Sequence, residues 1–206
     1  EGLVQKEKCD VLPGSGVDIE KFKPIEKNHD GVFRFLLISR MLWAKGIQEF
    51  VDAAKIMKEK HVKVEFQLLG HLDMKSPTAI SKEQMDIWVK DNYVNYLGSS
   101  DDVRVEIAQA DCVVLPSFYR EGTPRILLES ASMEKPIITT DNVGCRDVVN
   151  DSINGYLCEI KNVHDLADKM EKMLKLTDEQ RKTMGKAGRE KIVKEFDEQI
   201  VINKYL

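Results

Sequence analysis

Short apolar runs alternate with longer amphipathic segments along most of this chain. The runs at residues 33–39 and 112–115 are apolar at nearly every position, which is typical of strands buried on both faces of a sheet. Parallel sheets bury their strands in this way, so we expect the runs to form one sheet. The predicted strands are residues 9–12, 33–39, 64–69, 94–97, 112–115, 136–139 and 156–158.

Between the strands, apolar residues recur at the helical period. The segment 126–133 is apolar almost all round, so we expect that helix to be buried, and residues 21–31 and 72–85 are predicted as long connections. This alternation predicts a doubly wound, Rossmann-like α/β fold with a mostly parallel sheet, helices on both faces, and ligands at the carboxyl ends of the strands. The predicted helices are residues 47–57, 103–108, 126–133, 163–174 and 178–196.

Composition excludes several classes of protein. The 31 basic and 35 acidic residues give a formal net charge of -4, so an overall basic footprint for nucleic acid is absent. No run reaches the ~18 apolar residues that a spanning helix needs. The chain starts at Glu1 without an initiator methionine, and we interpret it as a fragment of a longer protein. The cysteines Cys9, Cys112, Cys145 and Cys158 form no C-x-x-C pair, which argues against a zinc ribbon or a thioredoxin motif. Three of them lie in apolar surroundings, where cysteine behaves as a small hydrophobic residue, so we expect a reducing, cytoplasmic compartment.

A glycine-rich turn follows the first predicted strand. Gly14 and Gly16 lie within residues 13–18 and would let the backbone pass close to a partner. A dinucleotide fingerprint needs a third glycine, and Ile19 stands at that position. A tight turn and a ligand contact are therefore both left open.

Two cations stand where the strand 33–39 ends and the next helix begins. Arg40 and Lys45 there would suit a phosphate group beside a helix N-terminus. Their spacing is equally compatible with two solvated charges.

The segment 119–125 and the helix after it carry the strongest chemical signal. Gly122 permits unusual backbone angles, and Pro124 suits the first helical turn, whose free amides attract anions. Glu129 lies about 8 Å below the start of that helix at 1.5 Å per residue, and its side chain leans back toward the N-terminus. A diphosphate on the amides and a ribose beside Glu129 would fit this distance. A carboxylate in so apolar a helix would otherwise be buried without a partner.

Two further strand ends are less decisive. Gly70 follows the strand 64–69, and Leu97 ends the next strand before a glycine. Each of these glycines could form a simple turn, or its missing side chain could leave room for a flat base. We predict no metal site, because no Asp-x-Asp occurs and the histidines His29, His61, His71 and His164 are isolated.

Several of these segments together resemble family 4 retaining glycosyltransferases of the GT-B fold. Glu121-Gly122-Thr123-Pro124 with Glu129 matches the E-x7-E motif of that family. Residues 13–24 resemble its "nGVD…F.P" segment and residues 39–46 its "GR…KG" segment, with Ser39 where glycine is usual. Residues 110–117 are similar to "aDv.v.PS" and residues 154–157 to "nG.l". The likeness covers about residues 9–196 and only the C-terminal, donor-binding half of that fold.

The resemblance implies a role for each matching residue. Arg40 and Lys45 would bind the donor diphosphate and stabilise its departure, and Glu129 would hydrogen-bond the ribose. Glu121 would face the sugar, which makes Arg40, Lys45 and Glu121 the implied catalytic residues. No metal and no cofactor are implied besides the nucleotide-sugar substrate. The implied donor-binding residues are Gly16, Arg40, Lys45, Gly70, Leu97, Glu121, Gly122, Thr123, Pro124 and Glu129.

Residues 120–125 and the turn at residues 14–16 together show a resemblance to a narrower subgroup of this family. This subgroup adds galactose or N-acetylgalactosamine to an undecaprenyl-diphosphate-linked sugar in bacterial O-antigen, capsule or protein-glycan assembly. This implies a UDP-sugar donor, with UDP-GalNAc or UDP-Gal favoured, and an acceptor at the inner face of the cytoplasmic membrane. Residues 1–206 would form one donor-binding domain, inactive alone, whose final helix at about 197–206 packs on a missing N-terminal acceptor half.

Two other functions share features of this sequence. A nucleotide-sugar 2-epimerase has the same fold, and a stand-alone nucleotide-binding or regulatory module belongs to another class. A parent gene encoding an N-terminal Rossmann-like half would disfavour the stand-alone module. The lysine-rich runs at 169–175 and 181–194 are predicted as a solvated helix face, with contact to an anionic membrane surface as the alternative.

Overall fold

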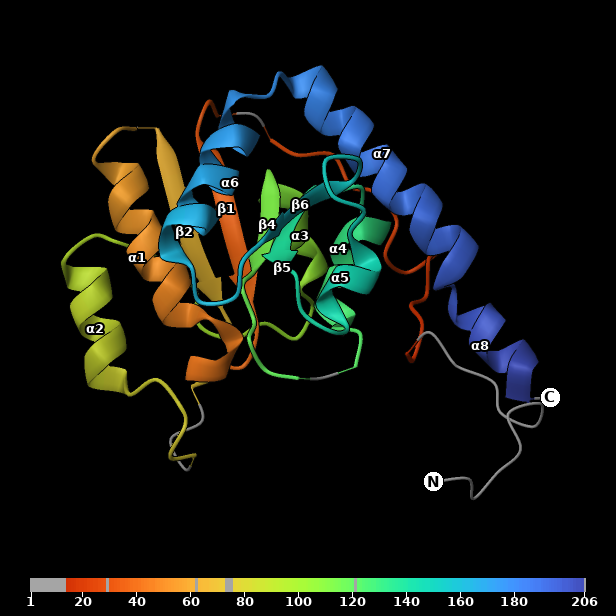
Figure 1. The fold of residues 1–206 in the computed structure, drawn as a ribbon, viewed down its shortest axis with the longest axis horizontal. Coiled ribbons are helices and arrows are strands. Elements are labelled where there is room, and N and C mark those ends of the chain that lie inside the picture. The colour runs from red at the N-terminus through yellow and green to blue at the C-terminus, as the bar shows by residue number, and fades with distance from the viewer. Residues whose placement is uncertain (1–13, 29, 62, 73–75, 121, 206) are drawn as a thin grey trace.

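The computed structural model describes residues 14–205 except 29, 62, 73–75 and 121. Six strands form one sheet in the order β3-β2-β1-β4-β5-β6, and every neighbouring pair is parallel (Figure 1). This order places a topological switch point between β1 and β4. The strands are β1 (Phe33–Ile38), β2 (Val64–Leu69), β3 (Asn95–Tyr96), β4 (Cys112–Leu115), β5 (Ile137–Thr140) and β6 (Gly155–Cys158).

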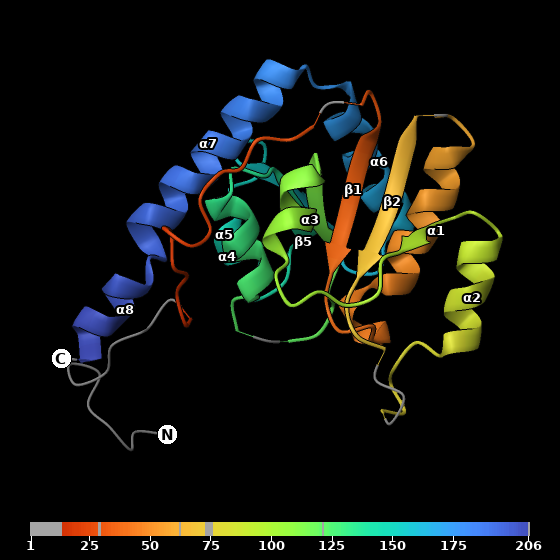
Figure 2. The same ribbon diagram turned by 180° about the vertical axis from the view of Figure 1, so that it is seen from behind.

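Helices cover both faces of this sheet. One hydrophobic core lies beneath α1, α2 and α6, and a second lies beneath α3, α4, α5 and α7 (Figures 1 and 2). The helices are α1 (Ile47–Lys58), α2 (Lys82–Lys90), α3 (Arg104–Gln109), α4 (Arg125–Ser132), α5 (Cys145–Val148), α6 (Val163–Lys175), α7 (Asp178–Glu195) and α8 (Glu198–Tyr205), with a 3-10 turn η2 (Trp43–Lys45).

Strand β1 shows why the apolar runs are continuous. Phe35 and Leu37 belong to the first core, whereas Leu36 and Ile38 belong to the second. Successive side chains of a strand point to opposite faces, so a strand with two covered faces needs apolar residues at every position. The predicted doubly wound α/β fold is confirmed.

The structure differs from the sequence prediction in two connections. The predicted connection 72–85 includes the start of α2, which Ser81 caps by accepting a hydrogen bond from the Gln84 amide at 3.1 Å. Only Met85 and Trp88 of this helix are buried, so its apolar periodicity is weak. The single turn α5 was also not predicted. The predicted strand 9–12 lies outside the described residues.

The N-terminal segment runs along α7 to the junction between α7 and α8 (Figure 2). The Val17 amide donates to the carbonyl of Phe196 at 2.9 Å, and the Glu198 amide donates to the carbonyl of Val17 at 3.1 Å. Helix α8 begins there, close to the predicted start of the final helix. Among the described residues, no helix has the length and apolar character needed to cross a membrane.

Candidate functional site

The loops after β1 and β4 meet at the carboxyl edge of the sheet. The Ala44 carbonyl accepts hydrogen bonds from the amides of Phe118 at 3.1 Å and Tyr119 at 3.2 Å, and from the hydroxyl of Ser117 at 3.3 Å. β1 and β4 are neighbours at the switch point, where open α/β sheets bind ligands. The loop that carries Lys45 therefore contacts the loop that leads from β4 toward α4.

Gly46 explains how Lys45 reaches this edge. Gly46 ends η2 and precedes α1 with a φ of +77°, and a Cβ there would come within 2.1 Å of the Pro116 carbonyl oxygen. Only glycine fits so close to another backbone. The Lys45 Nζ atom lies 5.8 Å from the centre of the Tyr119 ring. The tight approach thus places Lys45 beside the loop that follows β4.

Arg40 follows β1 at the same edge and is exposed. The next residue, Met41, is fully buried, and its amide donates to the carbonyl of His71 at 3.1 Å. The Met41 carbonyl accepts from the amide of Ile80 at 2.8 Å. On the other side of Arg40, the Ser39 amide donates to the carbonyl of Leu69 at 3.1 Å, so the backbone is held both before and after this exposed residue.

The amino end of α4 opens toward the same loops. Pro124 is the N-cap residue with φ -64° and ψ 122°, one position before the predicted helical turn, and no side chain caps the helix. The amides of the first turn are thus left without a side-chain acceptor and favour an anion. Gly122 does not have a positive φ, contrary to the expected unusual backbone angles, and a Cβ there would meet nothing within 4 Å. The glycine leaves open space in front of the helix.

Glu129 lies one turn into α4. Its side chain is 13% exposed, and its Oε1 atom is 3.5 Å from an Nη2 atom of Arg125. Burial raises the pKa of Glu129, while the charges of Arg125 and Lys21 oppose the shift. Arg125 is a partner that sequence reasoning missed, but it is largely exposed at 66%. The carboxylate therefore keeps capacity for a further hydrogen-bond donor.

The two glycines of the N-terminal turn have different neighbours. A Cβ on Gly14 would lie 3.3 Å from the Cβ of Thr123, so this turn touches the loop before α4. A Cβ on Gly16, whose φ is +70°, would come within 2.7 Å of the Glu198 Cα. The close approach at Gly16 is thus made to the α7–α8 junction, which supports the tight-turn interpretation there.

Gly70 also has a structural reason to be glycine. Its φ is +146°, and a Cβ would fall 1.7 Å from the carbonyl oxygen of Ser39. The Gly70 amide donates to the Gly98 carbonyl at 2.7 Å, and the Tyr96 hydroxyl donates to the Gly70 carbonyl at 2.8 Å. These contacts join the ends of β1, β2 and β3, beside the 42%-exposed Leu97.

Sequence reasoning missed the residues that hold the loop after β4 from the other side. The buried Asn142 side chain donates to the carbonyl of Tyr119 at 3.1 Å, and the hydroxyl of Thr140 donates to the carbonyl of Ser117 at 2.5 Å. Lys161 lies over the ring of Phe118, 4.3 Å from its centre. The signal was available in the polar residues that end a buried strand.

Some predicted residues lie outside the described part of the chain. Glu121, the first glutamate of the motif, is one of them, together with Pro13, Cys9 and His29. In the part that is described, no group of three or more His, Cys, Asp or Glu side chains is arranged to hold a metal ion.

Comparison with known proteins identifies relatives of this chain. It is 32% identical, over its full length, to the "N,N'-diacetylbacillosaminyl-diphospho-undecaprenol alpha-1,3-N-acetylgalactosaminyltransferase" of Campylobacter jejuni and covers 54% of that protein. The chain thus spans about half the length of this curated relative.

Solved structures share the fold. A glycosyltransferase from Rickettsia africae superposes with a TM-score of 0.84 at 22% identity, over 98% of this chain and 56% of that one. Anabaena Alr3699/HepE in complex with UDP superposes with a TM-score of 0.77 at 20% identity, over 92% of this chain and 54% of that one. Residues 18–191 match the family model described as "Glycosyl transferases group 1". The chain therefore belongs to the group 1 glycosyl transferases.

Proposed function

We propose that this chain is the donor-binding domain of a retaining glycosyltransferase and that it binds a UDP-sugar, with UDP-GalNAc favoured and UDP-Gal next. The observation that carries this proposal is the position of Glu129, a largely buried carboxylate one turn inside a helix whose amino end no side chain caps. Arg40 and Lys45 stand at the same sheet edge. The family match favours a transferase over the 2-epimerase and over a regulatory module.

The donor would lie along the start of α4. Its diphosphate would accept hydrogen bonds from the first amides of the helix, in the open space before Gly122. Glu129 is about 6 Å farther along the axis than Arg125 at 1.5 Å per residue, which is the span between a diphosphate and a ribose. The Glu129 carboxylate would accept hydrogen bonds from the ribose hydroxyls. Gly70 and Leu97 would border the base.

In the transfer, an acceptor hydroxyl oxygen forms a bond to the anomeric carbon of the sugar, the bond from that carbon to the β-phosphate oxygen breaks, and the hydroxyl proton passes to the departing diphosphate. Negative charge then grows on the departing diphosphate. Arg40, Lys45 and the helix amides would stabilise this charge because they are already in place before the bond breaks. Glu121 would face the sugar. These groups would stabilise the negative charge on the leaving diphosphate without a rearrangement of the protein.

The acceptor would be an undecaprenyl-diphosphate-linked sugar at the inner face of the cytoplasmic membrane. Support comes from the Campylobacter relative, whose name specifies a diphospho-undecaprenol substrate and whose length is about twice that of this chain. We propose that residues 1–206 form the donor half alone, that α8 packs on an acceptor half, and that the chain by itself transfers nothing.

Calorimetric titration of the chain with UDP-GalNAc, UDP-Gal, UDP-GlcNAc and GDP-mannose tests this function. We expect heat of binding with the UDP-sugars and a preference for UDP-GalNAc. Glu129→Gln should weaken binding, whereas the matched control Glu83→Gln, on the exposed surface of α2, should leave it unchanged. Saturating titrations without heat for every nucleotide sugar would refute the proposal.

A further inference from the structure

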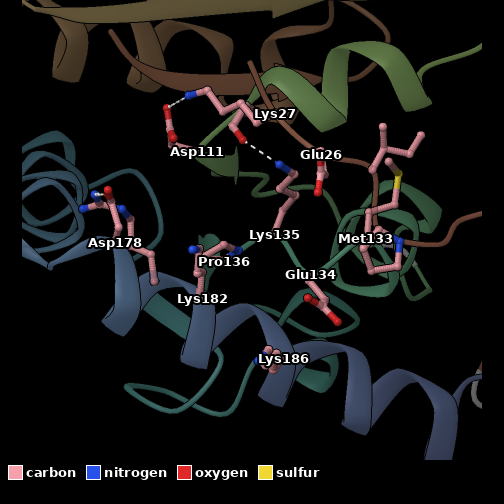
Figure 3. A pocket seen from close by; sticks show the side chains of 14 residues that line it. Glu26, Lys27, Asp111, Met133, Glu134, Lys135, Pro136, Asp178, Lys182 and Lys186 are labelled. Carbon is pink, nitrogen blue, oxygen red and sulfur yellow. Dashed lines mark hydrogen bonds and ion pairs between the residues drawn. The ribbon is translucent and has the colours of Figure 1, made fainter. Parts of the chain in front are cut away.

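A pocket lies at the amino-terminal edge of the sheet, opposite the proposed donor site, and the proposed transferase function uses none of it (Figure 3). Its volume is about 540 Å³. Asp111 and Pro136, which line it, directly precede β4 and β5, and α7 closes one side. We call this hollow the amino-edge pocket.

Lys135 extends through the middle of the amino-edge pocket toward the Lys27–Asp111 ion pair (Figure 3). Its Nζ atom donates to the carbonyls of Ala108 at 2.7 Å and Ala110 at 3.0 Å, where α3 ends. An ammonium group has three N–H bonds, and these carbonyls use two of them. Loss of the third proton would leave both hydrogen bonds intact and give the nitrogen a free electron pair.

Burial, rather than the charges around it, favours the neutral form of Lys135. Burial lowers the pKa of Lys135 to about 8, and nearby Lys27 adds to this shift, while Asp111 and Glu134 oppose it. Two ion pairs line the pocket, Lys27–Asp111 and Arg181–Asp178, and within each pair the positive and negative charges neutralise each other. The other charged residues lining the pocket are Glu26, Glu134, Lys182 and Lys186.

We propose that Lys135 is an acylation site, at which its amine takes an acyl group from a small acyl phosphate that enters the amino-edge pocket. The nitrogen electron pair forms a bond to the acyl carbon, and the bond from that carbon to the phosphate oxygen breaks. Inorganic phosphate leaves with the electron pair, and the extra amine proton passes to water. Lys182 and Lys186, on exposed positions of α7, attract the anionic donor.

Acylation would change the structure around α3. The resulting amide is neutral and keeps one N–H, so one of the two carbonyls loses its donor. Asp111 also loses a neighbouring positive charge. We therefore expect the acylated chain to melt at a lower temperature than the unmodified chain.

Treatment of the chain with acetyl phosphate at pH 8, followed by peptide mass mapping, tests the proposal. At that pH about half of Lys135 is uncharged, and we expect it to react about tenfold faster than the exposed Lys182 or Lys186 in the same sample. Lys135→Arg keeps the charge and the donors and should remove the modified peptide. Acetylation of Lys135 no faster than of Lys182 and Lys186 would overturn the proposal.

A second variant separates recruitment from reactivity. Lys182→Ala with Lys186→Ala should slow labelling of Lys135 by acetyl phosphate but not by uncharged N-acetylimidazole. Equal slowing by both reagents, or none by acetyl phosphate, would contradict capture of the anionic donor by α7.

Discussion

Gly46 lies directly against the Pro116 carbonyl, and this contact fixes the β1 and β4 loops to one another. A Cβ would come within 2.1 Å of that oxygen, at a φ of +77°. The Ala44 hydrogen bonds to Phe118 and Tyr119 strengthen the same junction. The position of Lys45 beside the loop that follows β4 therefore depends on one glycine.

Gly46→Ala should destabilise the chain by about 2–4 kcal/mol, because a positive φ and a backbone clash add together. Gly31→Ala is the matched control, since Gly31 has the same φ of +77° and nothing within 4 Å of its added Cβ. This control should cost only about 1 kcal/mol. Urea unfolding measures both, and equal losses would show that the contact with Pro116 is unimportant.

Glu129→Ala should weaken UDP binding by about 1–3 kcal/mol, because hydrogen bonds to a charged group are lost. Calorimetry with UDP measures the effect. The surface variant Glu83→Gln serves as the control. An unchanged dissociation constant for Glu129→Ala would remove Glu129 from the ribose site.

Binding should also depend on pH through Glu129. Burial raises the pKa of this carboxyl. As the pH falls, Glu129 therefore becomes protonated at a higher pH than an ordinary glutamate. Affinity for UDP-GalNAc should be full above that pKa and fall below it, while Glu129→Gln should bind weakly with a flat profile. A UDP-sugar is the better ligand here because its diphosphate lacks a terminal phosphate that titrates near pH 6. Identical profiles for both proteins would contradict the assignment.

Lys45→Ala in the full-length enzyme should lower turnover more than it lowers nucleotide affinity, since the charge on the leaving group develops fully only in the transition state. Lys90→Ala, an exposed change on α2, is the control. Steady-state kinetics and UDP titration measure the two effects. Wild-type turnover in Lys45→Ala would exclude this residue from the mechanism.

The full-length enzyme should stay active after treatment with EDTA. In the proposed site, Arg40, Lys45 and the amides of α4 would supply the positive charge that the leaving diphosphate needs. Activity assays before and after dialysis against the chelator test this. Complete loss that Mg²⁺ or Mn²⁺ restores would contradict it.

Much of the fold could be predicted because burial on both faces leaves a plain signal. The runs that became β1 and β4 are apolar at nearly every position, and α4 buries Leu127, Leu128 and Ala131. Strand β2 carries Glu65 and Gln67 between its apolar residues and still ends in two buried leucines. Helix α2 was missed because it rests on the core through Met85 and Trp88 alone. A short edge helix carries too few buried positions for its period to stand out.

The site was predicted only in part, because sequence shows which residues are unusual but not what lies against them. Gly16 and Gly70 were assigned to the donor, yet each faces another part of the backbone closely. Asn142 and Thr140 belong to no motif, and the sequence marks them only as polar residues at the end of a buried strand. The carbonyls to which they donate, those of Tyr119 and Ser117 after β4, are known only from the structure.

A crystal structure of the chain with UDP-GalNAc tests the central claim most directly. We predict the diphosphate at the first amides of α4, the ribose hydroxyls on the Glu129 carboxylate, and Arg40 and Lys45 beside the phosphates. A nucleotide bound at another edge of the sheet, or a ribose remote from Glu129, would contradict the account.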